Sequence, residues 1–280
     1  MKRLVTALSA VLLVTVVTAC APQAESPAAA AGCGTESLPV VRSGQLTVGT
    51  DRPAYEPWFS GDAPASGKGF ESAVAYAVAG QLGFSREAVR WTTVPFNNAI
   101  APGPKKFDFD INQVSISDAR RGAVDFSSGY YDVRQAVIAL KTSPVALATT
   151  IADLRDAKLG AQVGTTSLDV LQDVIRPTRA PAIYQKNDLA KSALANGQVD
   201  AIVVDLPTAF YITAAEVPEA KIVGQLPGGA RPEQFGLVLD KGSALTSCVS
   251  KAVDALRADG TLAKLEQEWL ADVAGAPVLK

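Results

Sequence analysis

Histidine is absent from this chain of 280 residues. Because histidine is the commonest general base and a frequent zinc ligand, its absence excludes Ser-His and Cys-His catalysis and most zinc sites, and we expect no metal or cofactor. A positive charge excess is also lacking, since 26 Lys and Arg residues stand against 28 Asp and Glu residues. The sequence therefore predicts no nucleic-acid partner. Apolar residues make up 48% of the chain, enough for the core of one large domain or two lobes.

The N-terminus has the pattern of an export signal. Two basic residues follow the initiating methionine, and residues 4–17 form a run of apolar and small residues that is too short to span a bilayer comfortably. The run leads into Val-Thr-Ala-Cys at residues 17–20, which is similar to the bacterial lipobox. We therefore expect a signal peptide over 1–19 and lipidation of Cys20, which would anchor the protein to the outer face of the cell membrane. The alternative is an ordinary cleaved signal followed by an incidental cysteine.

Residues 20–37 are small and rich in Ala and Pro. Such a stretch cannot bury enough apolar area to fold, so it is typical of a flexible tether. If Cys20 is lipidated, Cys33 and Cys248 remain of the three cysteines. An exported chain meets an oxidising compartment, which favours a disulfide between these two. The alternative is two unpaired thiols.

From residue 38 the chain alternates strand and helix patterns. Strands are predicted at 46–49, 89–94, 107–116, 135–140, 158–163, 200–204 and 235–239. Helices are predicted at 70–82, 166–175, 188–195, 206–215, 245–257 and 262–273. This alternation indicates an α/β fold in which parallel sheets carry helices on both faces. Ligands of such sheets bind outside the carboxyl ends of the strands, so the residues after each strand are the candidates for a site.

Arg120 lies beside one such strand end. Ser117 is a good N-cap for a short helix that would carry Arg120 in its first turn. A guanidinium group suits a carboxylate because it donates two parallel hydrogen bonds. The alternative is a solvated arginine paired with Asp118 or Asp125. The neighbouring Arg121 is expected to be solvated.

Two further strand ends carry polar residues of complementary character. Gly164 precedes Thr165 and Thr166 at a predicted helix start, where free N–H groups and hydroxyls favour an anion. The alternative there is a plain threonine-capped helix. Asp205 follows a buried strand and would suit an ammonium group. The alternative is an N-cap for the next helix, with Pro207 in the first turn, and the two roles are compatible because they can use different oxygens.

Aromatic residues follow the first two strands. Tyr55 and Trp58 come after the first strand, and Phe96 comes after the second. Their faces could sandwich an organic ligand, although core packing is the usual fate of such residues and is favoured for Trp58. A cation for a carboxylate, an anion for an ammonium group and a ring for a side chain together match an α-amino acid. The sequence offers no nucleophile–base pair.

The order of these segments resembles the family 3 extracellular solute-binding proteins of polar amino acid ABC importers. The resemblance covers roughly residues 40–272. It rests on six segments in order, LTVGTDRPAYEPW, KGFESAVAYAVAGQLG, FDFDINQVSISDARRGAVDFSSGYYD, DLRDAKLGAQVGTTS, ALANGQVDAIVVDLPTAFY and FGLVLDKGSALTSCVSKAVDALRADGTLAKLEQEWL.

The resemblance implies a type II periplasmic-binding-protein-like fold with two lobes and a ligand in the cleft between them. The first lobe would take residues 38–131 plus 235–280, and the second residues 135–230. The chain would cross between them near 132–135 and near 229–234. The cleft would close by a hinge motion around the ligand, and the importer would recognise the closed shape.

The resemblance also implies roles for individual residues. Arg120 would clamp the ligand carboxylate, helped by Thr165, Thr166 and Ser115. Asp205 would take the ammonium group. The side chain would meet residues of the first lobe, namely Tyr55, Asp51, Asn112 and Gln113.

The partners expected on this basis are an amino acid and a membrane permease, and the protein would be a monomer. One rival is a cleft enzyme of the same fold, a cyclic-carboxylate dehydratase, for which Asp51 and Glu56 are the candidate general acids. Another rival is an amino acid sensor that transports nothing.

Overall fold

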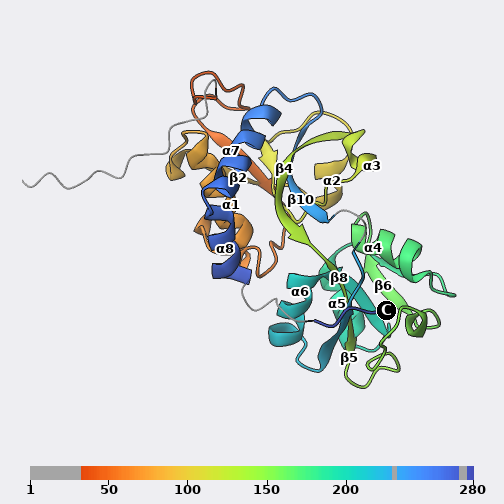
Figure 1. Cartoon of the computed structure of the whole chain (residues 1–280). Coiled ribbons are helices and arrows are strands. Elements are labelled where there is room, and N and C mark those ends of the chain that lie inside the picture. The colour runs from red at the N-terminus through yellow and green to blue at the C-terminus, as the bar shows by residue number, and fades with distance from the viewer. Residues whose placement is uncertain (1–32, 229–231, 271–275) are drawn as a thin grey trace, which may run out of the picture.

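The computed structural model describes residues 33–228, 232–270 and 276–280. The expected signal peptide over 1–19, Cys20 and most of the tether lie outside these residues. The strands form two five-stranded sheets, each covered by helices, and the sheets belong to two lobes (Figure 1). The predicted two-lobed α/β fold is confirmed. No helix in the described part is both long and apolar enough to cross a membrane.

The first lobe is built on a sheet with strand order β2-β1-β3-β10-β4. Its strands are β1 (Leu46–Thr50), β2 (Val89–Thr93), β3 (Phe109–Asp110), β4 (Val124–Val133) and β10 (Glu233–Asp240). Its helices are α1 (Phe70–Gln81), α2 (Phe96–Ile100), α3 (Asp118–Arg121), α7 (Thr246–Ala258) and α8 (Thr261–Leu270). Strands β1, β2 and β3 are parallel, whereas β10 is antiparallel to both of its neighbours.

The second lobe is built on a sheet with strand order β7-β6-β8-β5-β9. Its strands are β5 (Gln135–Leu140), β6 (Leu159–Gln162), β7 (Ala182–Tyr184), β8 (Ala201–Asp205) and β9 (Ala220–Gln225). Its helices are α4 (Thr166–Val170), α5 (Asn187–Ala195) and α6 (Leu206–Tyr211), and π-helical turns at Leu171–Ile175 and Ile212–Glu216 continue α4 and α6. Strand β5 is antiparallel to β8 and β9.

Both sheets are mixed rather than purely parallel as the sequence predicted. The reason is that β5 and β10 enter their sheets directly from the other lobe. A strand that arrives in this way has no helical crossover before it, so the parallel arrangement is not imposed on it.

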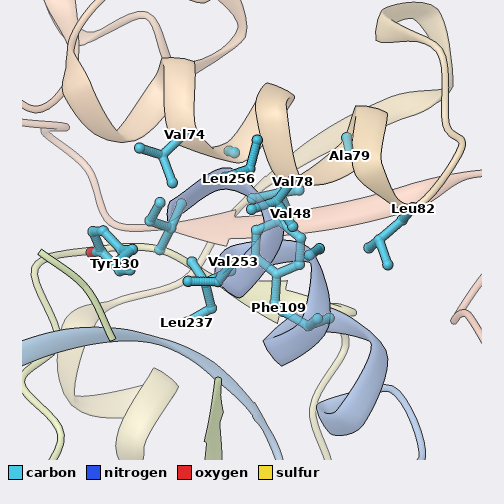
Figure 2. Close-up of a cluster of buried hydrophobic side chains, with 14 of the residues drawn as sticks. Val48, Val74, Val78, Ala79, Leu82, Phe109, Tyr130, Leu237, Val253 and Leu256 are labelled. Carbon is cyan, nitrogen blue, oxygen red and sulfur yellow. The ribbon is translucent and has the colours of Figure 1, made fainter. Parts of the chain in front are cut away.

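Apolar faces hold the first lobe together (Figure 2). Helix α1 presents Val74 and Val78, one helical turn apart, to the sheet residue Val48 and to Val253 and Leu256 of α7. These side chains are at most 3% exposed, and burying one such side chain stabilises the fold by roughly 1.5–3 kcal/mol. The resulting core holds the strand ends of this lobe in fixed positions.

The chain passes between the lobes along two neighbouring strands. Only Arg134 separates β4 from β5, so the first crossing lies within the predicted range 132–135. Strand β10 pairs with β4 along its length, starting from Glu233 opposite Val133 (Figure 1). Part of the second predicted crossing, residues 229–231, lies outside the described residues.

The predicted strand at 107–116 is much shorter in the structure, where β3 contains only Phe109–Asp110. The chain leaves the sheet after Ile111, and Gln113 adopts a left-handed conformation with φ of 50°. Its backbone N–H donates to the buried Glu71 of α1 at 2.7 Å. This turn brings residues 112 and 113 toward the other lobe instead of continuing the alternation.

The last residues do not lie with the first lobe, where the sequence analysis had placed residues 235–280. Val278 forms a parallel bridge with Gln225 of β9, and Leu279 is buried in the core of the second lobe. The C-terminus accordingly lies in the lower lobe of Figure 1. The apolar side chain of Leu279 accounts for this placement of the C-terminus. It packs against Gly224 near the end of β9, where a side chain at residue 224 would collide with it.

A disulfide joins Cys33 to Cys248 of α7, with the two Cα atoms 5.5 Å apart. The two cysteines are 215 residues apart in sequence. Cys33 is buried in the core of the first lobe. The bond therefore fixes the start of the described chain to the first lobe.

Removing this disulfide is expected to lower the free energy of unfolding by about 2–4 kcal/mol, because the bond restricts a long loop in the unfolded chain. Urea denaturation of the wild type with and without reductant measures the change. The double variant Cys33→Ser, Cys248→Ser is the control and should not respond to reductant. Equal midpoints for the oxidised and reduced wild type would contradict the expectation.

Candidate functional site

A cleft of about 420 Å³ lies between the lobes. This volume is within the usual range for small-molecule sites. Its walls combine residues from both sheets, namely Asp51, Tyr55, Phe96, Asn112, Gln113, Arg120, Gln162, Thr165, Thr166, Ser167, Asn187 and Asp205. The structure thus brings together every predicted ligand-binding residue except Ser115, which is buried behind the wall.

The strand ends explain why these residues meet. Asp51 follows β1 directly, Gln162 ends β6 and Asp205 ends β8. The carboxyl ends of parallel strands lie at one edge of a sheet, and the two lobes turn these edges toward each other. The predicted location of the site is therefore the location of the cleft.

Arg120 reaches from the first lobe to the second. Ser117 caps α3 by accepting a hydrogen bond from the backbone N–H of Arg120. The Arg120 guanidinium donates to the carbonyl of Ser115 at 2.6 Å and to the carbonyl of Gly164 in the second lobe at 2.8 Å. The surface pairing with Asp118 or Asp125 is not observed, since Asp125 pairs with Lys241 instead.

The guanidinium retains capacity for a ligand. Five N–H donors are available on an arginine side chain, and two are used by these carbonyls. Burial lowers the pKa of Arg120, while Asp169, Glu233 and Asp205 oppose that shift. Arginine nevertheless stays charged in proteins. Phe96 lies beneath it, with its ring centre 5.7 Å from the guanidinium carbon.

Glu233 is the residue at the hinge that the sequence analysis missed. Ser115 Oγ and Thr166 Oγ1 each donate to Glu233 Oε1 at 2.6 Å, and the two hydroxyls are 3.2 Å apart. The hydroxyls that were predicted to bind a ligand carboxylate therefore already bind an internal one. No periodic signal marked Glu233, because it lies in the predicted crossover rather than at the end of a strand.

Asp205 faces the cleft and also stands at the start of a helix. It occupies the N-cap position of α6, with Pro207 in the first turn, but its side chain accepts no capping hydrogen bond. Gln135 lies opposite Asp205 in the β5–β8 pair and donates to its Oδ1 at 2.8 Å. Burial, reinforced by the nearby Glu233, raises the pKa of Asp205 to about 8.

Thr165 caps α4, which confirms the alternative of a threonine-capped helix. Its hydroxyl donates to the carbonyl of Gln162 at 2.7 Å and accepts from the backbone N–H of Leu168 at 3.2 Å. Next to it, Ser167 donates to Gln135 Oε1 at 2.6 Å. Capping and cleft lining are compatible, because both threonines of this turn contribute to the wall.

Tyr55 and Asp51 form another part of the wall. The Asp51 carboxylate accepts backbone N–H groups of Arg52 at 2.6 Å and Phe96 at 3.2 Å. Lys186 of the second lobe approaches it to 3.9 Å. Burial, followed by the charge of Asp188, raises the pKa of Tyr55 above its ordinary value. The phenol therefore stays neutral.

The buried carboxyl group of Glu71 holds the part of the cleft wall that carries Asn112 and Gln113. Glu71 accepts hydrogen bonds from Gln113 and from Tyr130, and burial raises its pKa to about 7. The neighbouring Asn112 has a buried amide nitrogen with no partner among the described residues. These contacts fix the loop that follows β3.

Trp58 belongs to the core, as favoured from the sequence. Its ring is fully buried and makes edge contacts with Phe70, Tyr131 and Phe235. Its indole N–H donates to Thr208 Oγ1 of the second lobe at 2.9 Å. Trp58 therefore contacts both lobes and does not line the cleft.

Sequence reasoning also missed several polar residues of the site, which are Gln135, Gln162, Ser167 and Asn187. Gln135 and Gln162 were readable in principle, because a glutamine inside a buried strand needs a partner. Asn187 and Ser167 carried no such signal.

Residues 46–272 match the sequence profile of the bacterial extracellular solute-binding proteins, family 3. The chain belongs to this family. The match spans both lobes and includes every residue that lines the cleft.

Relatives of this solute-binding protein agree with the assignment. It is 29% identical over 247 residues to the L-cystine-binding protein TcyJ of Escherichia coli (strain K12), covering 86% of each chain. A solved ancestral arginine-binding protein bound to arginine is 29% identical, with a TM-score of 0.67 over 81% of this chain and 98% of its own. An ancestral amino acid-binding protein, AncCDT-1, described as a precursor of cyclohexadienyl dehydratase, is 27% identical, with a TM-score of 0.65 over 81% and 95%.

The buried Asp205 is expected to make stability depend on pH. In the unfolded chain an aspartate ionises near pH 4, but the folded protein retains this proton up to about pH 8. Between these values the folded state holds the extra proton, so the free energy of unfolding falls as pH rises, by at most about 1.4 kcal/mol per pH unit.

Asp205→Asn keeps the oxygen that accepts from Gln135 and removes the titration. The unfolding free energy of the wild type, relative to that of this variant, should therefore fall from pH 5 to pH 8 in urea denaturation. Asp254→Asn on the exposed face of α7 is the control for removal of one carboxyl group. Parallel pH profiles for the wild type and Asp205→Asn would refute the expectation.

Proposed function

We propose that this family 3 protein is the substrate-binding component of an ABC importer and that its solute is an amino acid. The observation that carries the proposal is the opposition of Arg120 and Asp205 across one cleft. The first offers unused N–H donors for a carboxylate, and the second offers a carboxyl group for an ammonium group. A zwitterion satisfies both at once.

The remaining wall residues would receive the rest of the ligand. Tyr55 offers an aromatic face, and Asn112, Gln113 and Asp51 offer polar groups beside it. The hydroxyls of Thr166 and Ser115 contribute indirectly, because they hold Glu233. Their proposed role is to hold Glu233 and, through it, the strand ends near Arg120 and Asp205.

The proposed motion is closure of the two lobes about the crossing strands. Contacts that join the lobes around the cleft include Arg120 to Gly164, Ser115 to Thr166, Trp58 to Thr208 and Lys186 to Asp51. A ligand that touches Arg120 in one lobe and Asp205 in the other binds the closed state better than the open state. Only this difference in affinity shifts the equilibrium toward closure.

The proposal extends to the location and partners. Cys20 would carry the lipid that holds the protein on the outer face of the cell membrane, and 21–32 would form most of the tether. The protein would act as a monomer and present the closed lobes to a membrane permease. Support comes from the lipobox-like sequence at 17–20 and from the family assignment.

The protein is proposed to bind rather than to catalyse. The candidate general acids Asp51 and Glu56 are both engaged by backbone N–H groups, from Arg52 and Phe96 in one case and from Gly61 in the other. The neighbour that is described as a dehydratase precursor is itself described as an amino acid-binding protein.

Binding is tested with the mature chain lacking Cys20, unfolded and refolded to remove any carried ligand. A panel of the twenty amino acids with cystine is screened by thermal shift. A ligand at about a thousand times its dissociation constant adds roughly 4 kcal/mol to the free energy of unfolding. The folded protein should respond to at least one amino acid, and failure with the whole panel would refute the proposal.

Arg120→Lys should weaken the best ligand by at least about tenfold, because hydrogen bonds to charged groups contribute roughly 1.5–3 kcal/mol and the lysine cannot donate two in parallel. Arg121→Lys is the matched control, since Arg121 is exposed and lies outside the cleft. Titration calorimetry measures both. Equal losses in the two variants would argue against the clamp.

Ligand binding should also release a proton from Asp205. Because the pKa of this group is about 8, the carboxyl group is mostly protonated at pH 7 and must ionise to pair with an ammonium group. Affinity is therefore expected to rise from pH 6 to pH 8. Calorimetry in buffers of different ionisation enthalpy measures the proton, and Asp205→Asn should abolish its release. A wild type that binds without releasing a proton would contradict the role of Asp205.

A further inference from the structure

A second cavity of about 270 Å³ adjoins the cleft. Tyr55 and Asn187 line both spaces, so these two residues stand at the boundary between them. The remaining walls of the second cavity are Glu56, Asp188, Lys191, Thr208, Tyr211, Ile212 and Glu216. The clamp residues Arg120 and Asp205 do not line it.

Helical spacing explains how the second cavity continues from the first. On α5, Asn187, Asp188 and Lys191 share one face because they are three and four residues apart. Helix α6 begins directly after Asp205 and leads to Tyr211. Thr208 and Tyr211 lie three and six residues after Asp205, so their positions along α6 are about 4.5 and 9 Å from it.

The charges of the second cavity do not balance. Lys191 lies 3.0 Å from Asp188 and 2.6 Å from Glu216, so its charge is compensated twice. Glu56 accepts the backbone N–H of Gly61 at 2.9 Å. Across residues 33–228, 232–270 and 276–280, no Lys or Arg approaches the carboxylate of Glu56 to within 4 Å. Three carboxylates against one ammonium group leave a net charge of −2.

The two tyrosines of the cavity respond to this excess of negative charge. Burial raises the pKa of Tyr211, and the charges of Glu56 and Glu216 raise it further. The pKa of Tyr55 is raised in the same way by burial and then by Asp188. Aromatic rings beside uncompensated carboxylates form an environment that attracts a cation.

We propose that the second cavity is a distal subsite and that the solute is an elongated amino acid with a cationic side chain. The inference rests on the proposed function, because the clamp must hold the α-amino and α-carboxyl groups for the side chain to point past Tyr55. Glu56 receives the cationic end, helped by Tyr55 and Tyr211. An anionic side chain would meet repulsion there, and a short side chain would not reach.

A ligand with a second zwitterionic end is disfavoured by the state of Lys191. A distal carboxylate would need this ammonium group as its partner. Lys191 is already held by Asp188 and Glu216 on both sides, so a distal carboxylate would have to displace one of them. A distal cation needs no such exchange.

The test is calorimetric titration of the refolded mature chain with arginine, lysine, glutamine, glutamate, alanine and cystine. Arginine or lysine should bind at least tenfold more tightly than glutamine, and glutamate should bind more weakly than glutamine. In Glu56→Gln, which retains an oxygen for the Gly61 N–H, the preference for arginine over glutamine should fall at least fivefold. Glutamine has no cationic end and serves as the reference ligand in this comparison.

Glu219→Gln is the matched control, because Glu219 is exposed in the same lobe as Glu216 and lies outside the cavity. It should leave the preference unchanged. Equal binding of arginine and glutamine, tightest binding of glutamate or cystine, or an unchanged preference in Glu56→Gln would each overturn the distal subsite while the proposed function stands. Binding of none of the six ligands by the folded protein would count against the proposed function itself.

Discussion

The carboxylate of Glu233 accepts a hydroxyl hydrogen bond from each lobe, and the arrangement of the cleft depends on it. Ser115 donates from the first lobe and Thr166 from the second, both at 2.6 Å, while Gln135 approaches from the crossing strand. Gln135 in turn holds Asp205 and Ser167. One side chain at the hinge thus positions the strand ends of both sheets. A carboxylate with several donors is stabilised where an unpaired one would be costly.

This network has an electrostatic consequence for the ligand site. Burial raises the pKa of Asp205, and the nearby charge of Glu233 raises it further. Arg120 provides the compensating positive charge and binds carbonyl groups in both lobes. The cleft therefore holds a guanidinium group and a buried carboxyl group together, beside the polar side chains of Asn112 and Gln113.

The fold and most of the wall could be predicted from the sequence, because they follow from strand ends. Arg120, Asp205 and Thr166 each lie directly after a periodic segment or at the start of a helix, and the structure brings them to one cleft. Glu233 and Asn187 could not be found in this way, since tertiary placement decides their positions. The early end of β3 was missed for a similar reason, because a buried contact from Gln113 to Glu71 overrides the alternating pattern.

The return of the C-terminal residues to the second lobe changes the mechanics of the hinge. Helix α8 ends at Leu270 in the first lobe, while Val278 is bridged to β9 in the second, so the chain joins the lobes three times rather than twice. The other two links are the adjacent strands β4 and β10. Six peptide units separate Leu270 from Ala276, and in any conformation they span at most about 20 Å. The end of α8 and the bridge at Val278 therefore stay within a short covalent reach of each other, which sets an upper limit on how far the two lobes can separate.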